Sequence, residues 1–338
     1  MSILEDHTID KPSDVVTTLV LVNTNTKTLH PLVSGADFYA LPKFSPNGNR
    51  ISWQQWFHPD MPWEGGEVYV ADVIANENIL SVKGEIHVAG VRGKVSAGYP
   101  SWRDNDNLIF TSDESGYVNP WKYTNGQASP LFSKPIAKDF GAPFWSLSNS
   151  FYALIDKEGK FALFVATADG RDVFFLVDLD GGSQPKLIES PFVVIGPIRT
   201  VSIEREEVVF KGQKTDEKAA ILRTSLSSLI NNQEFVALKN APAVMLDGAP
   251  LPRNIISLPQ PMTLKVSPND SPLPVIYYPP YNPSYSGSSI EGEKPPCVVH
   301  IHGGPTSLET QGLNWITQYF TSRGWAWWIS FFGLPFLF

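Results

Sequence analysis

The chain has 338 residues, 42% hydrophobic and 18% charged, a globular composition with room for two or three domain-sized units. Its formal net charge of −8 comes without a basic cluster, which argues against nucleic-acid binding. The single cysteine, Cys297, excludes an intrachain disulfide and a multi-cysteine metal site. Its place in an apolar run predicts a small, buried core residue.

The amino-terminal residues lack the basic and apolar regions of a secretory signal, so we expect a cytoplasmic protein. An upstream targeting segment in a longer parent chain would instead direct it to an organelle such as the plastid. The apolar stretch 325–338 is shorter than the ~20 residues that span a bilayer, and we expect no membrane anchor.

The first 250 residues repeat a layout of a proline, an aromatic or apolar residue, a polar turn and a β-rich run. The four segments are Pro42–Trp53, Pro100–Phe110, Pro143–Leu154 and Pro197–Phe210. Their prolines lie 58, 43 and 54 residues apart, which fits propeller blades of about 40–45 residues with loop insertions. Long stretches of helical period are missing between them, so a parallel α/β unit fits poorly.

Each repeat closes with a further strand-like run. These runs are Glu67–Val73, Trp121–Tyr123, Val173–Leu179 and Ala220–Thr224. Thr17–Asn23 resembles the closing strand of a preceding blade that is otherwise absent. About four blades and a fraction are visible, at the low end of the 4–8 blades that close a propeller ring, so we expect an incomplete propeller over residues 1–250.

A different region follows the proline-rich segment 240–261. We expect an antiparallel strand pair at 262–266 and 273–278, a surface loop at 281–296, and a buried strand at 297–301. The turn His302-Gly303-Gly304-Pro305 comes next. Residues 306–323 then carry helix-like apolar spacing at Leu313, Ile316 and Phe320.

Two segments are similar to the prolyl oligopeptidase family of serine peptidases, in its acylaminoacyl-peptidase and dipeptidyl-peptidase-like branch. The first is His58-Pro-Asp-Met-Pro-Trp-Glu64 with Glu67-Val-Tyr-Val-Ala-Asp72. The second comprises 279–283, 292–296, 302–306 and 318–326. The resemblance implies a mainly β fold, in which a partial β-propeller precedes the amino-terminal portion of an α/β-hydrolase domain at 251–338.

The resemblance also implies a function. His302, Gly303 and Gly304 would form an oxyanion-hole element, with Gly303 contributing a backbone N–H and Gly304 and Pro305 shaping the turn. Glycine suits such a turn because it adopts unusual φ/ψ values and lets a carbonyl approach closely. The family hydrolyses peptides, here short or amino-terminally blocked ones, through an acyl-enzyme. It needs no cofactor, and no His/Asp/Glu spacing resembles a metal site.

The Ser/Asp/His triad cannot be assigned in this sequence. No Gly-x-Ser-x-Gly motif occurs, Tyr285–Ser288 lies in the loop before the oxyanion strand, and residues 327–338 depart from the family pattern as an aromatic, uncharged tail. We therefore expect a truncated or splice-type variant that is inactive by itself. The alternative is a non-catalytic propeller module that binds peptides or a full-length homologue.

For the remaining candidate residues, a structural role is expected rather than a chemical one. His302 is expected to shape the turn rather than act as a base, and His300 to be a satisfied core histidine. Glu206-Glu207 could grip a peptide amino group, but a solvated hairpin turn explains this pair better. His58 and His87 are expected to have no chemical role.

Overall fold

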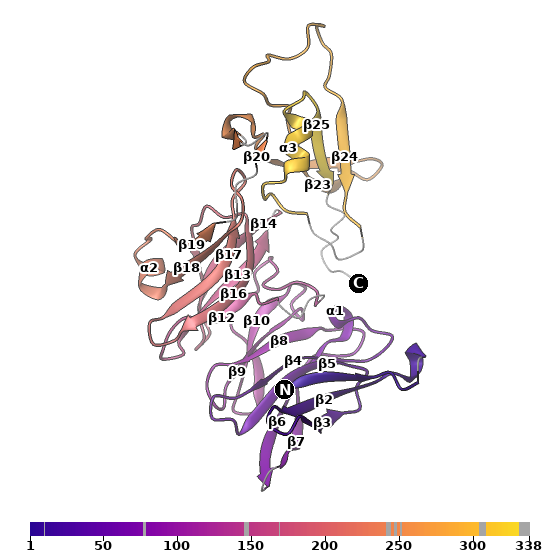
Figure 1. Ribbon diagram of the computed structural model, residues 1–338, viewed down its shortest axis with the longest axis vertical. Coiled ribbons are helices and arrows are strands. Elements are labelled where there is room, and N and C mark those ends of the chain that lie inside the picture. The colour runs from indigo at the N-terminus through magenta and orange to yellow at the C-terminus, as the bar shows by residue number, and fades with distance from the viewer. Residues whose placement is uncertain are drawn as a thin grey trace. The chain divides into compact units, whose positions relative to one another are not determined.

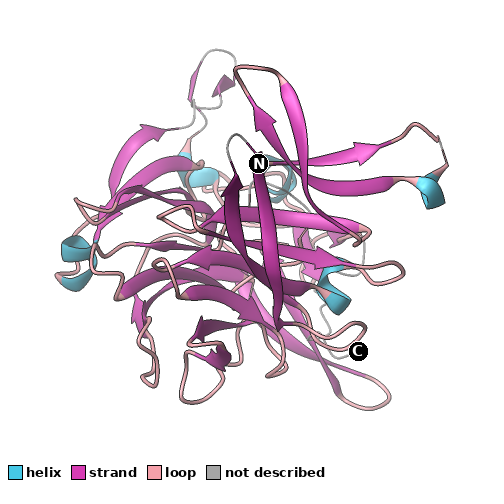
Figure 2. Ribbon diagram, turned by 90° about the horizontal axis from the view of Figure 1, so that it is seen from below, coloured by secondary structure: helices cyan, strands magenta, loops and turns pink. Residues whose placement is uncertain are grey.

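The computed structural model describes most of the chain, and strands dominate its secondary structure (Figure 2). Residues 10, 77–78, 145–148, 169, 241–244, 247–248, 251, 304–308 and 331–338 lie outside the described part. The chain divides into two compact units. The first comprises Met1–Ser150, Glu158–Ala162 and Val177–Lys186, and the second Phe151–Lys157, Leu163–Leu176 and Leu187–Phe338.

The first unit contains three antiparallel sheets whose strands follow one another in sequence order. A three-stranded sheet consists of β1 (Ser2–Asp6), β2 (Val16–Asn23) and β3 (Thr28–Ser34). The first four-stranded sheet consists of β4 (Phe38–Phe44), β5 (Arg50–Trp56), β6 (Glu67–Asn76) and β7 (Ile79–Ala89). The second consists of β8 (Ala97–Trp102), β9 (Leu108–Ser112), β10 (Asn119–Thr124) and β11 (Gln127–Pro130). The short helices are the 3-10 helix η1 (Pro12–Asp14) and α1 (Pro62–Gly65).

Two further four-stranded meanders and a small hairpin follow. One meander has residues in both units and consists of β12 (Tyr152–Leu154), β13 (Phe161–Ala168), β14 (Arg171–Asp178) and β15 (Lys186–Ile188). The other consists of β16 (Val194–Ser202), β17 (Glu207–Gln213), β18 (Ala220–Ser225) and β19 (Val236–Asn240), with α2 (Leu226–Ile230) after β18. The hairpin is β20 (Met245–Leu246) with β21 (Ala249–Pro250), before the 3-10 helix η2 (Arg253–Ile255).

Four-stranded meanders are the blades of a β-propeller, so the predicted partial propeller is confirmed within the described residues. Two details differ from the sequence interpretation. Thr17–Asn23 is not an isolated closing strand, because it lies in β2, the middle strand of a three-stranded sheet. In the third repeat β13 intervenes between the proline-led segment and the run Val173–Leu179, so that blade does not follow the common layout.

Equivalent residues of successive repeats contact one another. Lys43 Nζ donates to Ser101 Oγ (3.3 Å) and Asn47 N donates to Asn105 Oδ1 (2.9 Å), and each pair is 58 residues apart. That offset equals the spacing between the first two repeat prolines. Trp102 Nε1 also donates to Lys43 O (3.0 Å), so the tryptophan of one repeat is anchored on the proline strand of the preceding one.

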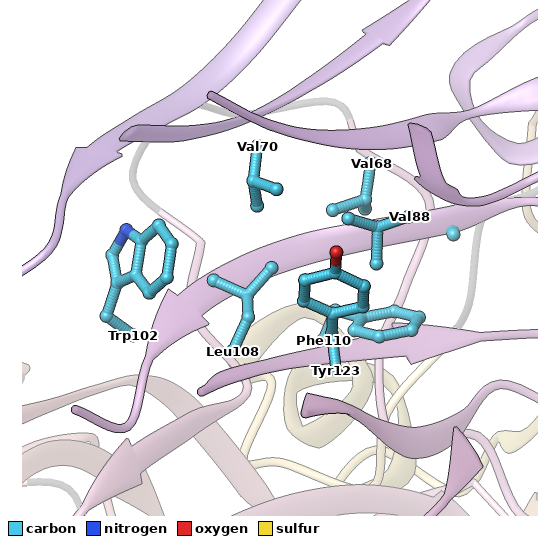
Figure 3. Close-up of a cluster of buried hydrophobic side chains, with 8 residues drawn as sticks. Val68, Val70, Val88, Trp102, Leu108, Phe110 and Tyr123 are labelled. Atoms are coloured by element: carbon cyan, nitrogen blue, oxygen red, sulfur yellow. The ribbon is translucent and has the colours of Figure 1, made fainter. Parts of the chain in front are cut away.

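A hydrophobic cluster fills the space between the two four-stranded sheets of the first unit (Figure 3). The buried side chains come from β6, β7, β8, β9 and β10. They are Val68, Val70, Val88, Ala97, Trp102, Leu108, Phe110 and Tyr123. Burial of a large apolar side chain contributes about 1.5–3 kcal/mol, so this cluster is a principal source of cohesion between the two blades.

A mixed sheet follows the blades in the second unit, in the strand order β22-β23-β25-β24. Its elements are β22 (Gln260–Val266), β23 (Ser271–Tyr278), β24 (Cys297–Ile301), α3 (Trp315–Thr321) and β25 (Ala326–Ser330). The expected antiparallel pair β22–β23 is confirmed, and β24 pairs in parallel with β25. α3 lies in the crossover between these parallel strands and beside β25 (Figure 1). The Phe320 ring of α3 packs on the Trp327 ring of β25, with ring centroids 5.5 Å apart.

The prediction that 297–301 is a buried strand is wrong for this chain. β24 lies at the sheet edge, with Val299 60% and Ile301 57% exposed, and Cys297 is exposed as well. An apolar run predicts a strand covered on both faces, but coverage depends on neighbours that the run itself does not encode.

The predicted helix 306–323 is shorter than expected and buries a different face. α3 begins after Asn314, whose Oδ1 accepts hydrogen bonds from Ile316 N (2.9 Å) and Thr317 N (3.4 Å). Ile316 is 62% exposed, whereas polar Gln318 is 2% exposed. Gln318 can be buried because its amide bonds the backbone of Ser257 twice, from Ser257 N (2.7 Å) and to Ser257 O (3.1 Å).

The predicted domain boundary after residue 250 stays a prediction. The two compact units divide within the repeats, and the second unit holds both the blade β16–β19 and the mixed sheet.

Candidate functional site

The predicted oxyanion element follows directly after β24. His302 and Gly303 are described, whereas Gly304 and Pro305 lie outside the described residues. β24 runs parallel to β25, and Ile301, its last residue, lies opposite Ser330. The turn therefore begins at the carboxyl end of a parallel strand pair, which is where open α/β sheets bind their ligands.

Gly303 has open space on its side-chain side. No described atom lies within 4 Å of the position that a Cβ would occupy, and its φ is outside the left-handed region. A left-handed φ is therefore not the reason for glycine at position 303. The second reason for glycine, close approach of a reacting carbonyl, is compatible with the open space.

His302 is half-buried, and within the described part of the chain its imidazole has no partner. Nδ1 and Nε2 are both buried without a hydrogen-bond partner among the described residues. Leaving a buried polar atom without a hydrogen bond costs about 1–3 kcal/mol of folding stability. The His302 ring therefore offers two nitrogen atoms beside Gly303 for further hydrogen bonds.

His300 was expected in the core, and this placement is wrong. Its side chain is 45% exposed and its Nε2 lies 2.9 Å from Glu309 Oε1. Its ring stacks on Trp327 with centroids 5.8 Å apart. The imidazole is satisfied, as predicted, but through Glu309, which no sequence pattern indicated because the pair joins a strand to the far side of the turn.

The other candidate residues from the sequence make contacts within their own sheets and turns. Glu206 adopts a φ of 54° in the turn before β17. Glu207 pairs with Arg205 of the same turn (3.3 Å) and with Arg223 of the neighbouring strand β18 (3.5 Å). These local ion pairs support the hairpin interpretation of the two glutamates. In the first unit, the His87 ring packs edge-on against Tyr69.

Within the described residues, no cluster of three or more His, Cys, Asp or Glu side chains is arranged to hold a metal ion. None of the helices in that part of the chain combines the length and the apolar character needed to cross a membrane.

The chain is similar to solved peptidase structures. A puromycin-hydrolysing peptidase from Mycobacterium tuberculosis matches 89% of the chain at 29% identity and a TM-score of 0.76, over 43% of its own length. A puromycin hydrolase S511A mutant complexed with PGG matches 97% of the chain at 23% identity and a TM-score of 0.82, over 47% of its length. A prolyl endopeptidase at 11% identity, with a TM-score of 0.66, shares the fold. No family model and no curated protein matches.

These likenesses show that the chain has the fold of propeller-bearing peptidases. Its structural neighbours, puromycin-hydrolysing peptidases and prolyl endopeptidases, are those of the prolyl oligopeptidase family that its sequence motifs resemble. The chain spans less than half the length of the structures that it matches.

Proposed function

We propose that the chain supplies the propeller portion and the first strands of the α/β-hydrolase domain of a serine-type peptidase. The observation that carries this proposal is the His302–Gly303 turn at the end of β24, with its open space at Gly303. A peptide carbonyl could approach this turn, and Gly303 N–H would stabilise the oxyanion of an acyl-enzyme reaction. The substrates would be short or amino-terminally blocked peptides, as in the acylaminoacyl-peptidase-like branch.

The 338 residues alone are proposed to be inactive as a peptidase. Their sequence holds no Gly-x-Ser-x-Gly nucleophile motif, and an oxyanion hole without a nucleophile cannot form an acyl-enzyme. A fluorophosphonate probe, which labels activated serines, should leave this chain unlabelled while it labels an active serine peptidase in the same reaction. Stoichiometric labelling of the chain would overturn the inactivity proposal.

A second candidate function is a binding module for peptides or for a full-length homologous peptidase. The observation that favours it is the exposed apolar edge strand β24, because an edge strand can pair with another chain. Size-exclusion chromatography of a mixture with the homologous peptidase would test it, and co-elution at equimolar ratio is the expected result.

The proposal includes a cytoplasmic location, which the single unpaired Cys297 supports. Fluorescence imaging of a carboxyl-terminally tagged chain would test it, and signal confined to an organelle would contradict it.

A further inference from the structure

We infer that Gln213, at the end of blade strand β17, is a positioning residue for the segment that joins the oxyanion turn to α3. The inference rests on the proposed function of that turn. Gln213 would couple a propeller blade to the proposed hydrolase portion through a small set of contacts, all of which lie within the second unit.

The side chain of Gln213 holds the backbone of Leu313. Its Nε2 donates to Leu313 O (2.9 Å), and Leu313 N donates to Lys214 O (3.2 Å). Gln213 is itself fixed, because it pairs with Val194 in the β16–β17 ladder and its carbonyl accepts from Val193 N (2.9 Å). The segment therefore docks on a strand end that cannot easily shift.

Gly312 lets its segment approach the side chains of Gln213 and Val194 closely. A Cβ at this position would lie 2.8 Å from Gln213 Oε1 and 2.9 Å from Val194 Cγ2, closer than real Cβ contacts allow. The φ of Gly312 is outside the left-handed region, so close approach rather than backbone conformation explains this glycine.

The docked segment leads directly into α3. Asn314, the next residue after Leu313, caps the helix through Ile316 N and Thr317 N. The middle of the helix is anchored by Gln318 on Ser257. A displacement of Leu313 would therefore move the first turn of α3, where Trp315 lies, and leave the anchored middle in place.

A charged contact ties the same blade end to the chain near η2. Glu217 lies 3.2 Å from Lys214 Nζ and 3.1 Å from the Arg253 guanidinium. Exposed pairs of this kind contribute at most about 1 kcal/mol. The two hydrogen bonds that Leu313 makes with Gln213 and Lys214, together with the Gly312 contact, therefore carry most of the coupling.

The test uses the full chain labelled with 5-fluorotryptophan and its ¹⁹F NMR spectrum. Trp315 is assigned by Trp315→Phe among the ten tryptophans. Gln213→Met removes the amide donor at nearly constant length, and Gly312→Ala pushes the two segments apart. Gln127→Met, at an exposed glutamine of the first unit, is the matched control.

We expect both Gln213→Met and Gly312→Ala to shift or broaden the Trp315 resonance, with the other resonances and the Gln127→Met spectrum unchanged. Hydrogen exchange at Leu313 N should be about tenfold faster in Gln213→Met, since its backbone partner loses support. An unmoved Trp315 signal in Gln213→Met, or a change shared by all resonances, would overturn the inference. The readout does not depend on peptidase chemistry, so serine labelling of the chain would overturn the proposed function and leave this result standing.

Discussion

Replacing Asp113 by asparagine is expected to stabilise the protein at neutral pH. Asp113 follows β9, and its Oδ1 accepts a hydrogen bond from Ser96 N (2.8 Å). Burial, with smaller contributions from the negative charges of Asp139 and Glu114, raises the pKa of Asp113 from 3.8 to about 6. Asparagine keeps an acceptor oxygen for Ser96 N and removes the buried negative charge.

The magnitude follows from the difference between the two pKa values. A shift of about two units corresponds to about 3 kcal/mol, which partial exposure reduces to about 1–2 kcal/mol. Because the folded state holds the proton more tightly, the contribution of Asp113 to stability is greatest below pH 4 and falls as pH rises through 4–6. The advantage of Asp113→Asn should therefore be largest above pH 6.

The assay is thermal unfolding of wild type, Asp113→Asn and the exposed control Asp106→Asn at a series of pH values. At pH 7.5 the Asp113 variant should melt about 2–8 °C higher, with the difference vanishing toward pH 4. The control should follow wild type throughout. A lower melting temperature for Asp113→Asn at pH 7.5 would show that the carboxylate contributes favourably and would refute the reasoning.

Three further predictions concern the second unit and the edge strand. The exposed Cys297 thiol should react with Ellman's reagent in the native protein, although its raised pKa slows the reaction; reaction only in denaturant would contradict its exposure. Gln318→Leu should cost about 2–4 kcal/mol in urea unfolding, because it leaves the buried Ser257 backbone unpaired; a neutral effect would refute the anchor. The Phe210 ring lies among three other phenylalanine rings, with centroid distances of 5.0–5.6 Å. Phe210→Ala should therefore lower the free energy of unfolding in urea by about 3–5 kcal/mol. The control Phe44→Ala, at an exposed ring, should lower it by less than about 1 kcal/mol.

The repeating blades were predictable because their signal is local. A proline, an aromatic residue, a polar turn and a β-rich run recur, and each repeat builds its own meander. The offset of 58 residues even predicts which residues meet, since Lys43 contacts Ser101 and Asn47 contacts Asn105. The repeats do not encode the variation in the third blade, in which β13 lies between the proline-led segment and the run Val173–Leu179.

The mixed sheet β22–β25 and α3 were less predictable, because the burial of their residues depends on partners that are distant in the sequence. Val299 and Ile301 look like core residues in sequence, but β24 has β25 as its neighbour and lies at the edge. The apolar spacing at Ile316 pointed to the wrong face of α3. The buried face is polar, and only the three-dimensional approach of Ser257 makes Gln318 a good core residue.

The end of β24 offers two kinds of unused binding capacity, and they favour different occupants. A small acyl group at Gly303 would use the open space and could pair with the His302 imidazole, leaving Val299 and Ile301 exposed. A strand added to the free edge would cover those two side chains and leave Gly303 open. Cys297 begins the same strand, so its alkylation rate separates the two cases. A peptide ligand at the turn should leave that rate unchanged, whereas a strand-donating partner should slow it about tenfold or more. The reactivity of the Cys297 thiol would thus distinguish the proposed catalytic use of the turn from the proposed binding role of the edge strand.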